Sequence, residues 1–439
     1  MKAGRFFINR SNMIQEQTDK DSLCGSGVTF GGLGIAPKLL DVLLKLGFKI
    51  PTSIQLKAIP FAILGKDIIG VAQTGTGKTL AFGIPMVQQI LKNGNPSTGS
   101  GRGGRGLIIL PTRELAIQVN EFIQKIGRVF GIKTAVLIGG TPIRPQIKTI
   151  REGANVFIGT PGRIVDHLEQ KTLNLQDVSI LVLDEADRMF DMGFAPQLNK
   201  ILQVVPKNRQ TMLFSATMPD GIVKIASNHM KLPVRVEIAI SGTTAENIEH
   251  EFFVVKREQR VPLLKKLLGE YKGSVLVFLR TKFGAKKVCS GLRDIGISAI
   301  EIHSNRSLGQ RKAALEGFKL GRNRVLVATD IASRGIDVKG IELVINFDLP
   351  ENAEDYVHRI GRTGRAGMKG KAISFVLPDQ GSKVREIEKL TRLCLPISRL
   401  PDFPCVLSQQ PSVRSNFRGG GHFSHKKRPS SYFSYGKRK

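Results

Sequence analysis

The chain has 439 residues, with 66 Lys and Arg against 36 Asp and Glu, which gives a net charge of +30 at pH 7. At ~150 residues per domain this length predicts two or three domains, and no apolar run reaches the ~20 residues that a membrane-spanning helix needs. The composition therefore excludes a helical membrane protein. It favours a polyanionic partner, usually nucleic acid, with an anionic membrane surface as the lesser alternative.

The N-terminal stretch is basic, but its apolar patch at residues 6–8 is too short for a signal peptide. We expect a flexible segment over residues 1–27 of a cytoplasmic protein, and an organellar transit segment remains the open alternative. The four cysteines stand far apart without a Cys-x-x-Cys pair, which is typical of reduced thiols and of neither a zinc site nor a disulfide framework.

Short apolar runs recur along the chain, each followed by a turn and then by helix-like spacing. This alternation is typical of a parallel sheet with crossover helices, and it predicts an α/β fold with two domains in tandem, at 28–239 and 251–400. The first set of runs covers 66–72, 106–111, 154–161, 180–185 and 211–217, and the second covers 274–281, 298–303, 323–330, 342–350 and 371–378.

Three polar segments separate or flank these runs. Residues 240–250 are polar and interrupted by glycine, and we expect them to form the interdomain linker. Residues 94–106 predict a solvated surface loop, with Arg102 and Arg105 as possible phosphate contacts. Residues 401–439 predict a disordered tail, whose last part from Pro411 has eight Lys or Arg, no acidic residue and scattered aromatic rings. That composition favours sequence-tolerant binding of single-stranded nucleic acid, and a solubilising tail is the alternative.

The stretch AQTGTGKT at 72–79 follows an apolar strand and opens a helix. In that context its glycines allow backbone N–H groups to surround phosphate oxygens. Lys78 reaches the terminal phosphates, and the Thr79 hydroxyl can ligate Mg²⁺. We therefore predict an ATP site formed by Thr74, Gly75, Thr76, Gly77, Lys78 and Thr79.

The stretch ILVLDEAD at 180–187 ends an apolar strand in carboxylates, at the edge where doubly wound sheets hold ligands. Asp184 is the candidate to hold Mg²⁺, directly or through water, and Glu185 to orient and deprotonate an attacking water. Helix capping is the alternative role for Asp184, and the neighbouring phosphate loop argues against it.

Seven motifs occur in this order along the chain: AQTGTGKT, PTRELA, TPGR, DEAD, SAT, ATDIASRGID and HRIGRTGR. Together they resemble the motif series of DEAD-box ATP-dependent RNA helicases over about residues 30 to 380, and the whole chain is most similar to the bacterial RhlE-like branch. The resemblance implies two RecA-like domains, an ATP hydrolase that acts as an RNA helicase, and RNA as the partner.

The resemblance also places an adenine pocket. The stretch GFKIPTSIQ at 47–55 is similar to the family's adenine-reading motif, with Gln55 bonding the adenine edge and Phe30 stacking on the ring. Phe48 belongs to the same implied pocket. Without the family, helix position alone would place Gln55 toward solvent. Ser215 and Thr217 correspond to the motif that couples the phosphate site to domain closure, by bonding to Asp187.

The resemblance implies RNA contacts in both domains, mostly through the phosphate backbone. Thr112 and Thr160 are also expected to cap helices. One departure from the family concerns Leu308, which stands where a Gln is frequent, three residues before Arg311. The implied contacts are Pro111, Thr112, Arg113, Gly140, Thr160 and Arg163 in the first domain, and Arg280, Thr281, Arg311, Thr329 and Asp330 in the second.

The second domain contains no phosphate loop, so its arginines must serve a site in the first domain. We expect Arg362 and Arg365 to approach the γ-phosphate, His358 to link Asp187 with that phosphate, and Asp337 to contact the ribose or the arginine loop. Arg359 is expected to brace the loop or its neighbours. With ATP and RNA absent, the two domains are expected to be open.

Three functions fit these motifs. ATP-driven separation of short RNA duplexes and remodelling of ribonucleoproteins is the reading we favour, in a monomer that could serve ribosomal or RNA-decay assemblies. A non-unwinding, ATP-gated RNA clamp would use the same motifs. A DNA helicase differs only in contacts to the 2′-OH, and these leave no readable pattern in the sequence.

Overall fold

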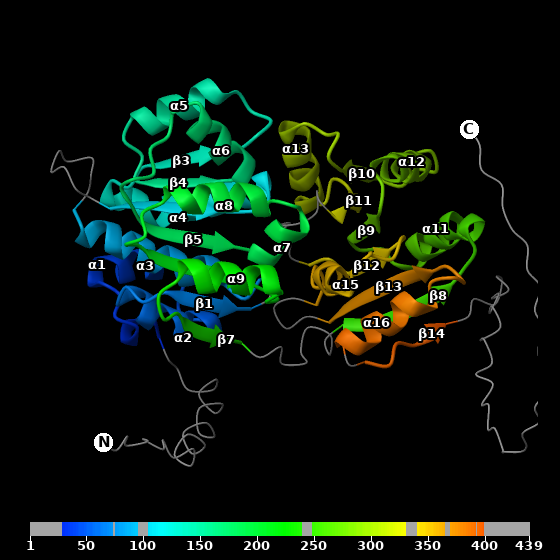
Figure 1. The fold of residues 1–439 in the computed structure, drawn as a ribbon. Coiled ribbons are helices and arrows are strands. Elements are labelled where there is room, and N and C mark those ends of the chain that lie inside the picture. The colour runs from blue at the N-terminus through cyan, green and yellow to red at the C-terminus, as the bar shows by residue number, and fades with distance from the viewer. Residues whose placement is uncertain are drawn as a thin grey trace, which may run out of the picture.

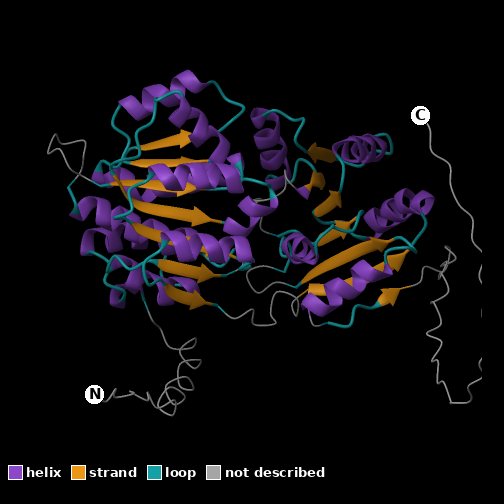
Figure 2. Ribbon diagram, viewed as in Figure 1, coloured by secondary structure: helices purple, strands orange, loops and turns teal. Residues whose placement is uncertain are grey.

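The structure is a computed structural model that describes residues 29–72, 75–94, 104–238, 248–330, 340–364, 369–391 and 393–398. The chain folds into two α/β domains, each built around a seven-stranded sheet with helices on both faces (Figures 1 and 2). This confirms the predicted fold class of two mainly parallel sheets flanked by helices.

The first sheet is parallel throughout, in the order β3-β4-β2-β5-β6-β1-β7. Successive residues of a strand point to opposite faces, so Ile180 and Val182 join one core cluster while Leu181 and Leu183 join the other. Both faces are covered, which explains why these strands read as continuous apolar runs.

The strands of this sheet are β1 Ile68–Val71, β2 Arg105–Ile109, β3 Thr134–Leu137, β4 Val156–Gly159, β5 Val178–Asp184, β6 Gln210–Ser215 and β7 Val234–Glu237. The 3₁₀-helices of the first domain are η3 Phe30–Gly32 and η5 Arg128–Phe130. Its α-helices are α1 Pro37–Lys45, α2 Ser53–Ile63, α3 Lys78–Lys92, α4 Arg113–Gly127, α5 Ile143–Arg151, α6 Pro161–Glu169, α7 Ala186–Asp191, α8 Ala195–Val204 and α9 Asp220–His229.

The second sheet has the order β10-β11-β9-β12-β13-β8-β14, which is the order of the first sheet when the strands are counted from β8. Its strands are β8 Ile248–Val254, β9 Val275–Leu279, β10 Ala299–Ile302, β11 Val325–Thr329, β12 Leu343–Asn346, β13 Gly370–Val376 and β14 Ile397–Ser398. Its helices are η6 Arg257–Gln259, α11 Arg260–Glu270, α12 Lys282–Arg293, α13 Leu308–Lys319, α15 Ala353–Ile360 and α16 Gly381–Thr391.

The structure differs from the sequence expectations at several edges. Strands β3, β7, β8 and β14 were absent from the predicted runs. Because β8 begins at Ile248, the last three residues of the expected 240–250 linker pair in the second sheet. Arg105 lies in β2 beside Asp177, at 3.8 Å, and over the Phe157 ring, so it is not a residue of a free loop. Residues 95–103 and the tail from 399 lie outside the described residues.

The two domains touch each other. Helix α13 of the second domain faces the first (Figure 1): Arg311 Nη2 lies 2.7 Å from Glu114 Oε2, and Leu308 packs against the first domain's core. The open arrangement expected without ligands is therefore not the one seen. Within the described ranges, no helix combines the length and the apolar composition that would let it cross a bilayer.

Candidate functional site

The phosphate loop lies where β1 meets α3, at the carboxyl edge of the first sheet. Gly75 and Gly77 have φ values of +93° and +91°, a left-handed conformation that glycine adopts without steric cost. Lys78 is the first residue of α3, and its side chain is buried. Its Nζ donates to the Ala72 carbonyl at 3.1 Å and lies 3.8 Å from Asp184 Oδ1. The loop and the DEAD carboxylates therefore form one site.

Gln55 connects the adenine-reading motif to this loop. Its Nε2 donates to the Gly77 carbonyl at 3.0 Å, and its Oε1 accepts from the Thr52 N–H at 2.9 Å as part of a capping box. The side chain is 2% exposed, so the solvent-facing position expected from helix spacing alone is wrong. The amide retains a second donor and a second lone pair, so the adenine contact stays a prediction.

The two implied aromatic residues lie in the first domain's core region. Phe30 is 1% exposed within the cluster on one face of the sheet, and stacking on a base would require that ring to become exposed. Phe48 is half-buried and meets Phe122 edge to face, with ring centroids 6.1 Å apart. Their roles in an adenine pocket stay predictions.

The first two carboxylates of the DEAD motif, Asp184 and Glu185, are both buried, but their environments differ. Burial raises the pKa of Asp184 to about 6, although Lys78 acts in the opposite direction. Burial would also raise the pKa of Glu185, but the positive charges of Arg188 and Lys78 outweigh it and bring that pKa down to about 2. Asp184 is thus the carboxylate whose ionised form would gain more from a nearby cation, while Glu185 is a weak proton acceptor.

Arg188 is a functional candidate that sequence reasoning missed. Its Nη1 lies 2.6 Å from Glu185 Oε2, and the residue is 1% exposed. Glu185 itself has φ +53°, and the short helix α7 begins directly after it. Arg188 stands immediately after the DEAD motif, and that position is the only signal in the sequence that could have identified it.

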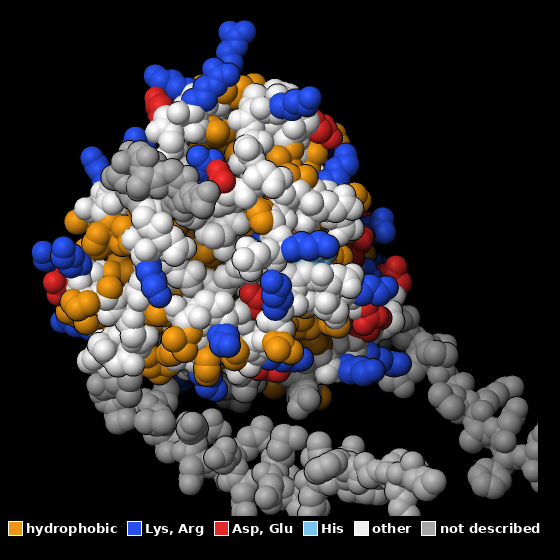
Figure 3. All heavy atoms as spheres, turned by 60° about the vertical axis from the view of Figure 1, so that its left-hand side comes forward, with side chains coloured by type: hydrophobic (Ala, Val, Ile, Leu, Met, Phe, Trp, Pro, Cys, Tyr) orange, Lys and Arg blue, Asp and Glu red, His pale blue; other side chains and the backbone are white. Residues whose placement is uncertain are grey.

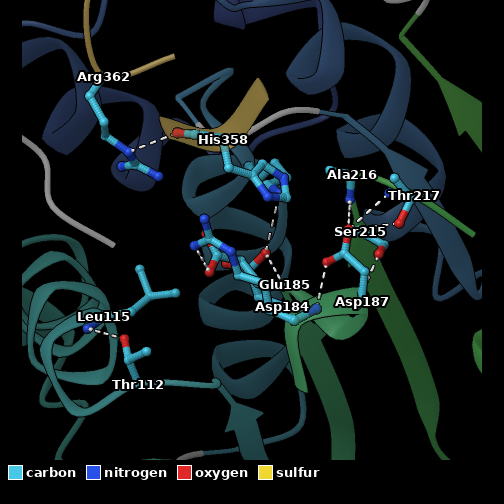
Figure 4. A network of polar contacts seen from close by, with 12 residues as sticks. Thr112, Leu115, Asp184, Glu185, Asp187, Ser215, Ala216, Thr217, His358 and Arg362 are labelled. Atoms are coloured by element: carbon cyan, nitrogen blue, oxygen red, sulfur yellow. Dashed lines mark hydrogen bonds and ion pairs between the residues drawn. The ribbon is translucent and has the colours of Figure 1, made fainter. Parts of the chain in front are cut away.

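Asp187 connects the DEAD motif to the residues that follow β6 (Figure 4). Its Oδ2 accepts from the N–H groups of Ala216 and Thr217, both at 2.9 Å, and from the Thr217 hydroxyl at 3.2 Å. Its own N–H donates to the Ser215 hydroxyl at 3.1 Å. The structure joins these residues as the resemblance implied, and the coupling role itself stays a prediction.

His358 and Arg362 of the second domain lie in the same polar network, and the charges of Asp187 and Glu185 act on His358 (Figure 4). Arg362 is buried and His358 is half-buried, and the Arg362 Nε donates to the His358 carbonyl at 3.3 Å. Burial, followed by the charge of Arg188, lowers the pKa of His358 to about 3, so this imidazole is neutral. The positive charge of Arg362 also helps to lower the pKa of Glu185, which places that arginine within electrostatic reach of this carboxylate.

Arg359 has the bracing role that we expected. Its Nε and Nη2 lie 2.6 and 2.7 Å from the two Asp330 carboxylate oxygens, and its Nη1 donates to Asn346 and to the Asp348 carbonyl. It is 2% exposed. This bidentate pair already uses the carboxylate of Asp330, so a direct RNA contact by that carboxylate would have to compete with Arg359.

The implied RNA contacts of the first domain gather at one corner. The guanidinium of Arg113 lies against Gly140, where an added Cβ would meet Arg113 Nη1 at 2.0 Å, and Arg163 donates to the Thr141 carbonyl. Thr112 caps α4 by accepting from the Leu115 N–H (Figure 4), whereas Thr160 stands at the N-cap of α6 without a side-chain bond. Pro111 is buried beside Thr112.

The implied contacts of the second domain separate into two groups. Arg280 and Thr281 are exposed at the end of β9, and Thr329 ends β11 with 8% of its surface exposed. Arg311, by contrast, is buried against Glu114. In this arrangement it forms an ion pair between the two domains, and the implied RNA contact by Arg311 stays a prediction.

Three predicted site residues, Thr74, Asp337 and Arg365, lie outside the described residues. Among the residues that are described, no group of three or more His, Cys, Asp or Glu converges as a metal cage. Mg²⁺ at nucleotide sites binds through one or two protein oxygens together with substrate phosphates and water. Asp184 and the half-buried Thr79 supply such oxygens.

Comparison with known proteins identifies both halves of the chain. Residues 52–225 match the model of the DEAD/DEAH box helicase family, and residues 259–367 match that of the helicase conserved C-terminal domain. The chain is 42% identical over 365 residues to the DEAD-box ATP-dependent RNA helicase CshA of Bacillus cereus, covering 83% of this chain and 68% of CshA.

Two solved structures share the arrangement of both domains. S. cerevisiae Dbp5 bound to RNA and ADP BeF3 is 31% identical, with a TM-score of 0.72 over 85% of this chain and 95% of that one. Mss116p bound to single-stranded RNA and AMP-PNP is 27% identical, with a TM-score of 0.77 over 86% of this chain and 80% of that one.

Proposed function

Because this chain belongs to the DEAD-box family of ATP-dependent RNA helicases, we propose that it couples ATP binding and hydrolysis to local separation of short RNA duplexes and to remodelling of RNA–protein complexes. One observation carries the proposal: His358 and Arg362 of the second domain lie within electrostatic reach of the buried DEAD carboxylates of the first. Hydrolysis can therefore depend on the contact between the domains.

The first domain supplies the nucleotide site. Lys78 and the N–H groups of the loop up to Thr79 bind phosphate oxygens, and Gln55 orients the loop through Gly77. Thr79 and Asp184 are the residues that would hold Mg²⁺, which supplies charge neutralisation on the phosphates. The raised pKa of Asp184 fits this role, because a nearby cation stabilises its ionised form.

Glu185 positions the attacking water in this proposal. Its carboxylate is ionised at neutral pH and too acidic to be a strong base, which favours orientation of the water over early removal of its proton. Arg188 fixes that carboxylate through the 2.6 Å ion pair. Arg362, with Arg365, stabilises the charge that develops on the transferred phosphoryl group, which is the part an arginine finger plays.

The RNA strand is proposed to lie across both domains and to be gripped through its phosphates. The exposed Arg280 and Thr281, together with the Arg113, Gly140 and Arg163 corner, provide backbone-directed donors that do not read bases. ATP and RNA both favour contact between the domains, so each should favour the binding of the other. A strand bent by this grip cannot remain in a straight duplex.

Several finer assignments belong to the same proposal. Membership of the RhlE-like branch is proposed from the compact core and the basic tail. We also propose that the protein is monomeric and cytoplasmic, and that it serves ribosomal or RNA-decay assemblies. The thiol of Cys289 is buried, and burial raises its pKa to about 11, which fits an unreactive, reduced cysteine.

Strand separation distinguishes the helicase from the clamp. A short labelled RNA duplex should separate in an ATP-dependent manner, and poly(U) should stimulate ATP hydrolysis more than poly(dT). Stimulated hydrolysis and stable RNA binding without separation of any short duplex would favour the ATP-gated clamp. Equal stimulation by both polymers would favour a protein that does not distinguish RNA from DNA.

A further inference from the structure

The second domain repeats the strand order of the first, so every strand of one sheet has a counterpart in the other. Counted from the first strand of each domain, β8 corresponds to β1, β12 to β5 and β13 to β6. In the first domain, these strands carry the phosphate loop, Asp184 and Ser215 at their carboxyl ends. The corresponding edge of the second sheet is where a ligand site would lie.

A charged pair occupies the matching place in the second domain. Lys78 is the first residue of α3 and lies 3.8 Å from Asp184. Arg260 is the first residue of α11, and its Nη1 lies 2.5 Å from Asp348 Oδ1, just beyond β12. The guanidinium of Arg260 also sits over the Phe347 ring, at 4.8 Å, and its Nε is buried without a hydrogen-bond partner.

A cavity of about 790 Å³ opens at this edge, next to Arg280 and Thr281. Helices α11 and α12 pack on one face of the second sheet (Figure 1), and residues of both helices line the cavity. Its apolar surface includes Val261, Val288, Phe347 and Phe375. Five cationic side chains line it against two carboxylates: Arg257, Arg260, Arg280, Lys287 and Lys383 against Asp348 and Asp379.

We propose that this cavity binds a nucleotide, with the base against the apolar wall and the phosphate at the cationic rim. Volumes of ~300–1,000 Å³ are typical of small-ligand sites, and an excess of positive charge favours a phosphate. The 3₁₀-turn Arg257–Gln259 replaces the glycine-rich loop, so a nest for a triphosphate is absent from this described edge. A ligand with one phosphate therefore fits the site better than ATP does.

The same charge excludes the chain's own tail as the occupant, because the segment from Pro411 carries eight Lys or Arg and no acidic residue. The nucleotide has two possible sources: a free mononucleotide, or one unit of the RNA strand bound beside Arg280. Only the second source rests on the proposed function.

Two pairs of variants test the cavity. Gly291 lines it on α12, and an added Cβ there meets nothing within 4 Å, so Gly291→Phe should fill the space without steric conflict. Gly269→Phe is the control, because Gly269 lies on α11 with an equally open Cβ and is not part of the lining. Lys287→Glu reverses one charge of the rim, and Lys286→Glu changes the neighbouring exposed lysine outside it.

Full-length protein saturated with AMP-PNP is titrated with labelled GMP, and its affinity for RNA is compared with that for the same RNA carrying abasic sites. If the natural ligand is a free nucleotide, GMP should bind to the wild type. It should bind about tenfold more weakly after Lys287→Glu and not detectably after Gly291→Phe. For an RNA unit, loss of one base should weaken binding about fivefold to a hundredfold in the wild type and not in Gly291→Phe. The two control variants should match the wild type.

The proposal is overturned if GMP fails to bind and if base removal affects wild type, Gly291→Phe and Gly269→Phe equally. Hydrolysis of ATP at saturating RNA is measured in the same preparations. Normal hydrolysis together with those results would refute nucleotide binding in the cavity and would leave the helicase function unaffected. Absence of RNA-stimulated hydrolysis in the wild type would count against the proposed function instead.

Discussion

The two domains share one strand order, but they place different chemistry on the same edge. The first has a glycine loop with left-handed turns, a buried lysine and two buried carboxylates. The second has a 3₁₀-turn of charged residues and an arginine–aspartate pair. The comparison teaches that the fold fixes where a ligand site lies, while a few loop residues decide which ligand binds there.

The first domain's face is not a simple basic surface. In Figure 3, Lys and Arg side chains are spread over the face that is turned forward, with exposed hydrophobic side chains between them. The cations that we propose to act in hydrolysis are buried instead, namely Lys78, Arg188 and Arg362. The large net charge therefore indicates the class of partner, and the buried cations indicate the chemistry.

The largest contrast between the domains should appear when their matching cations are removed. Lys78→Ala should weaken ATP binding by about 1.5–3 kcal/mol or more, because it removes charge-assisted bonds to phosphates. Arg260→Ala, the counterpart in the second domain, should leave ATP affinity unchanged. Equilibrium titration with a fluorescent ATP analogue measures both. Equal losses in the two variants would mean that the ATP site has been misassigned.

The next effect concerns the buried Glu185–Arg188 ion pair beside the first domain's nucleotide site. Arg188→Met should lower the free energy of unfolding by about 3–5 kcal/mol, because Glu185 would stay buried without its 2.6 Å ion-pair partner. The double variant with Glu185→Gln should recover much of that loss. Denaturant unfolding of the single and double variants measures the coupling, and purely additive losses would contradict it.

A smaller effect should follow pH. With a pKa of about 6, Asp184 is ionised above pH 6 and increasingly protonated below it, so protons compete with Mg²⁺ at low pH. The apparent Mg²⁺ affinity for ATP hydrolysis should fall about tenfold per pH unit well below pH 6 and level off above it. An affinity that stays constant from pH 7 to pH 5 would argue against this carboxyl as the metal ligand.

The smallest effect belongs to neither domain. Deletion of residues 411–439 should weaken RNA binding and flatten its salt dependence. For single strands, log K falls by ~0.7 per tenfold rise in salt concentration for each phosphate that the protein neutralises. Hydrolysis at saturating RNA should be unchanged. Titrations at several salt concentrations measure the slope, and an identical slope in the shortened chain would show that the tail does not bind RNA.

The sequence predicted the strands whose apolar runs are continuous, including short ones such as β1 and β4. It missed β7 and β14, which lie at one edge of their sheets. Strand β7 is only partly buried, and β14 has two residues. It also missed β3, a short strand at the opposite edge of the first sheet. It missed β8, which lies beside β14 and whose residues alternate in exposure. Three of these four strands lie at the edge of a sheet, and β8 is the exception.

Within the site, sequence spacing located the phosphate loop and the DEAD carboxylates, because each motif is contiguous. It could not place Arg311 against Glu114, since that pair joins residues 197 positions apart across two domains. Nor could it separate the environments of Asp184 and Glu185, because burial in the folded protein raises the pKa of Asp184, whereas the charges of Arg188 and Lys78 outweigh burial and lower the pKa of Glu185.

The central claim is that the first domain binds ATP and the second completes its hydrolysis. Measurement of ATP affinity and of single-turnover hydrolysis in Arg362→Ala tests this claim most directly. We expect nearly unchanged ATP binding with hydrolysis slowed by ~10³-fold or more, as for loss of an arginine finger. Hydrolysis at the wild-type rate in a folded Arg362→Ala protein would contradict the account.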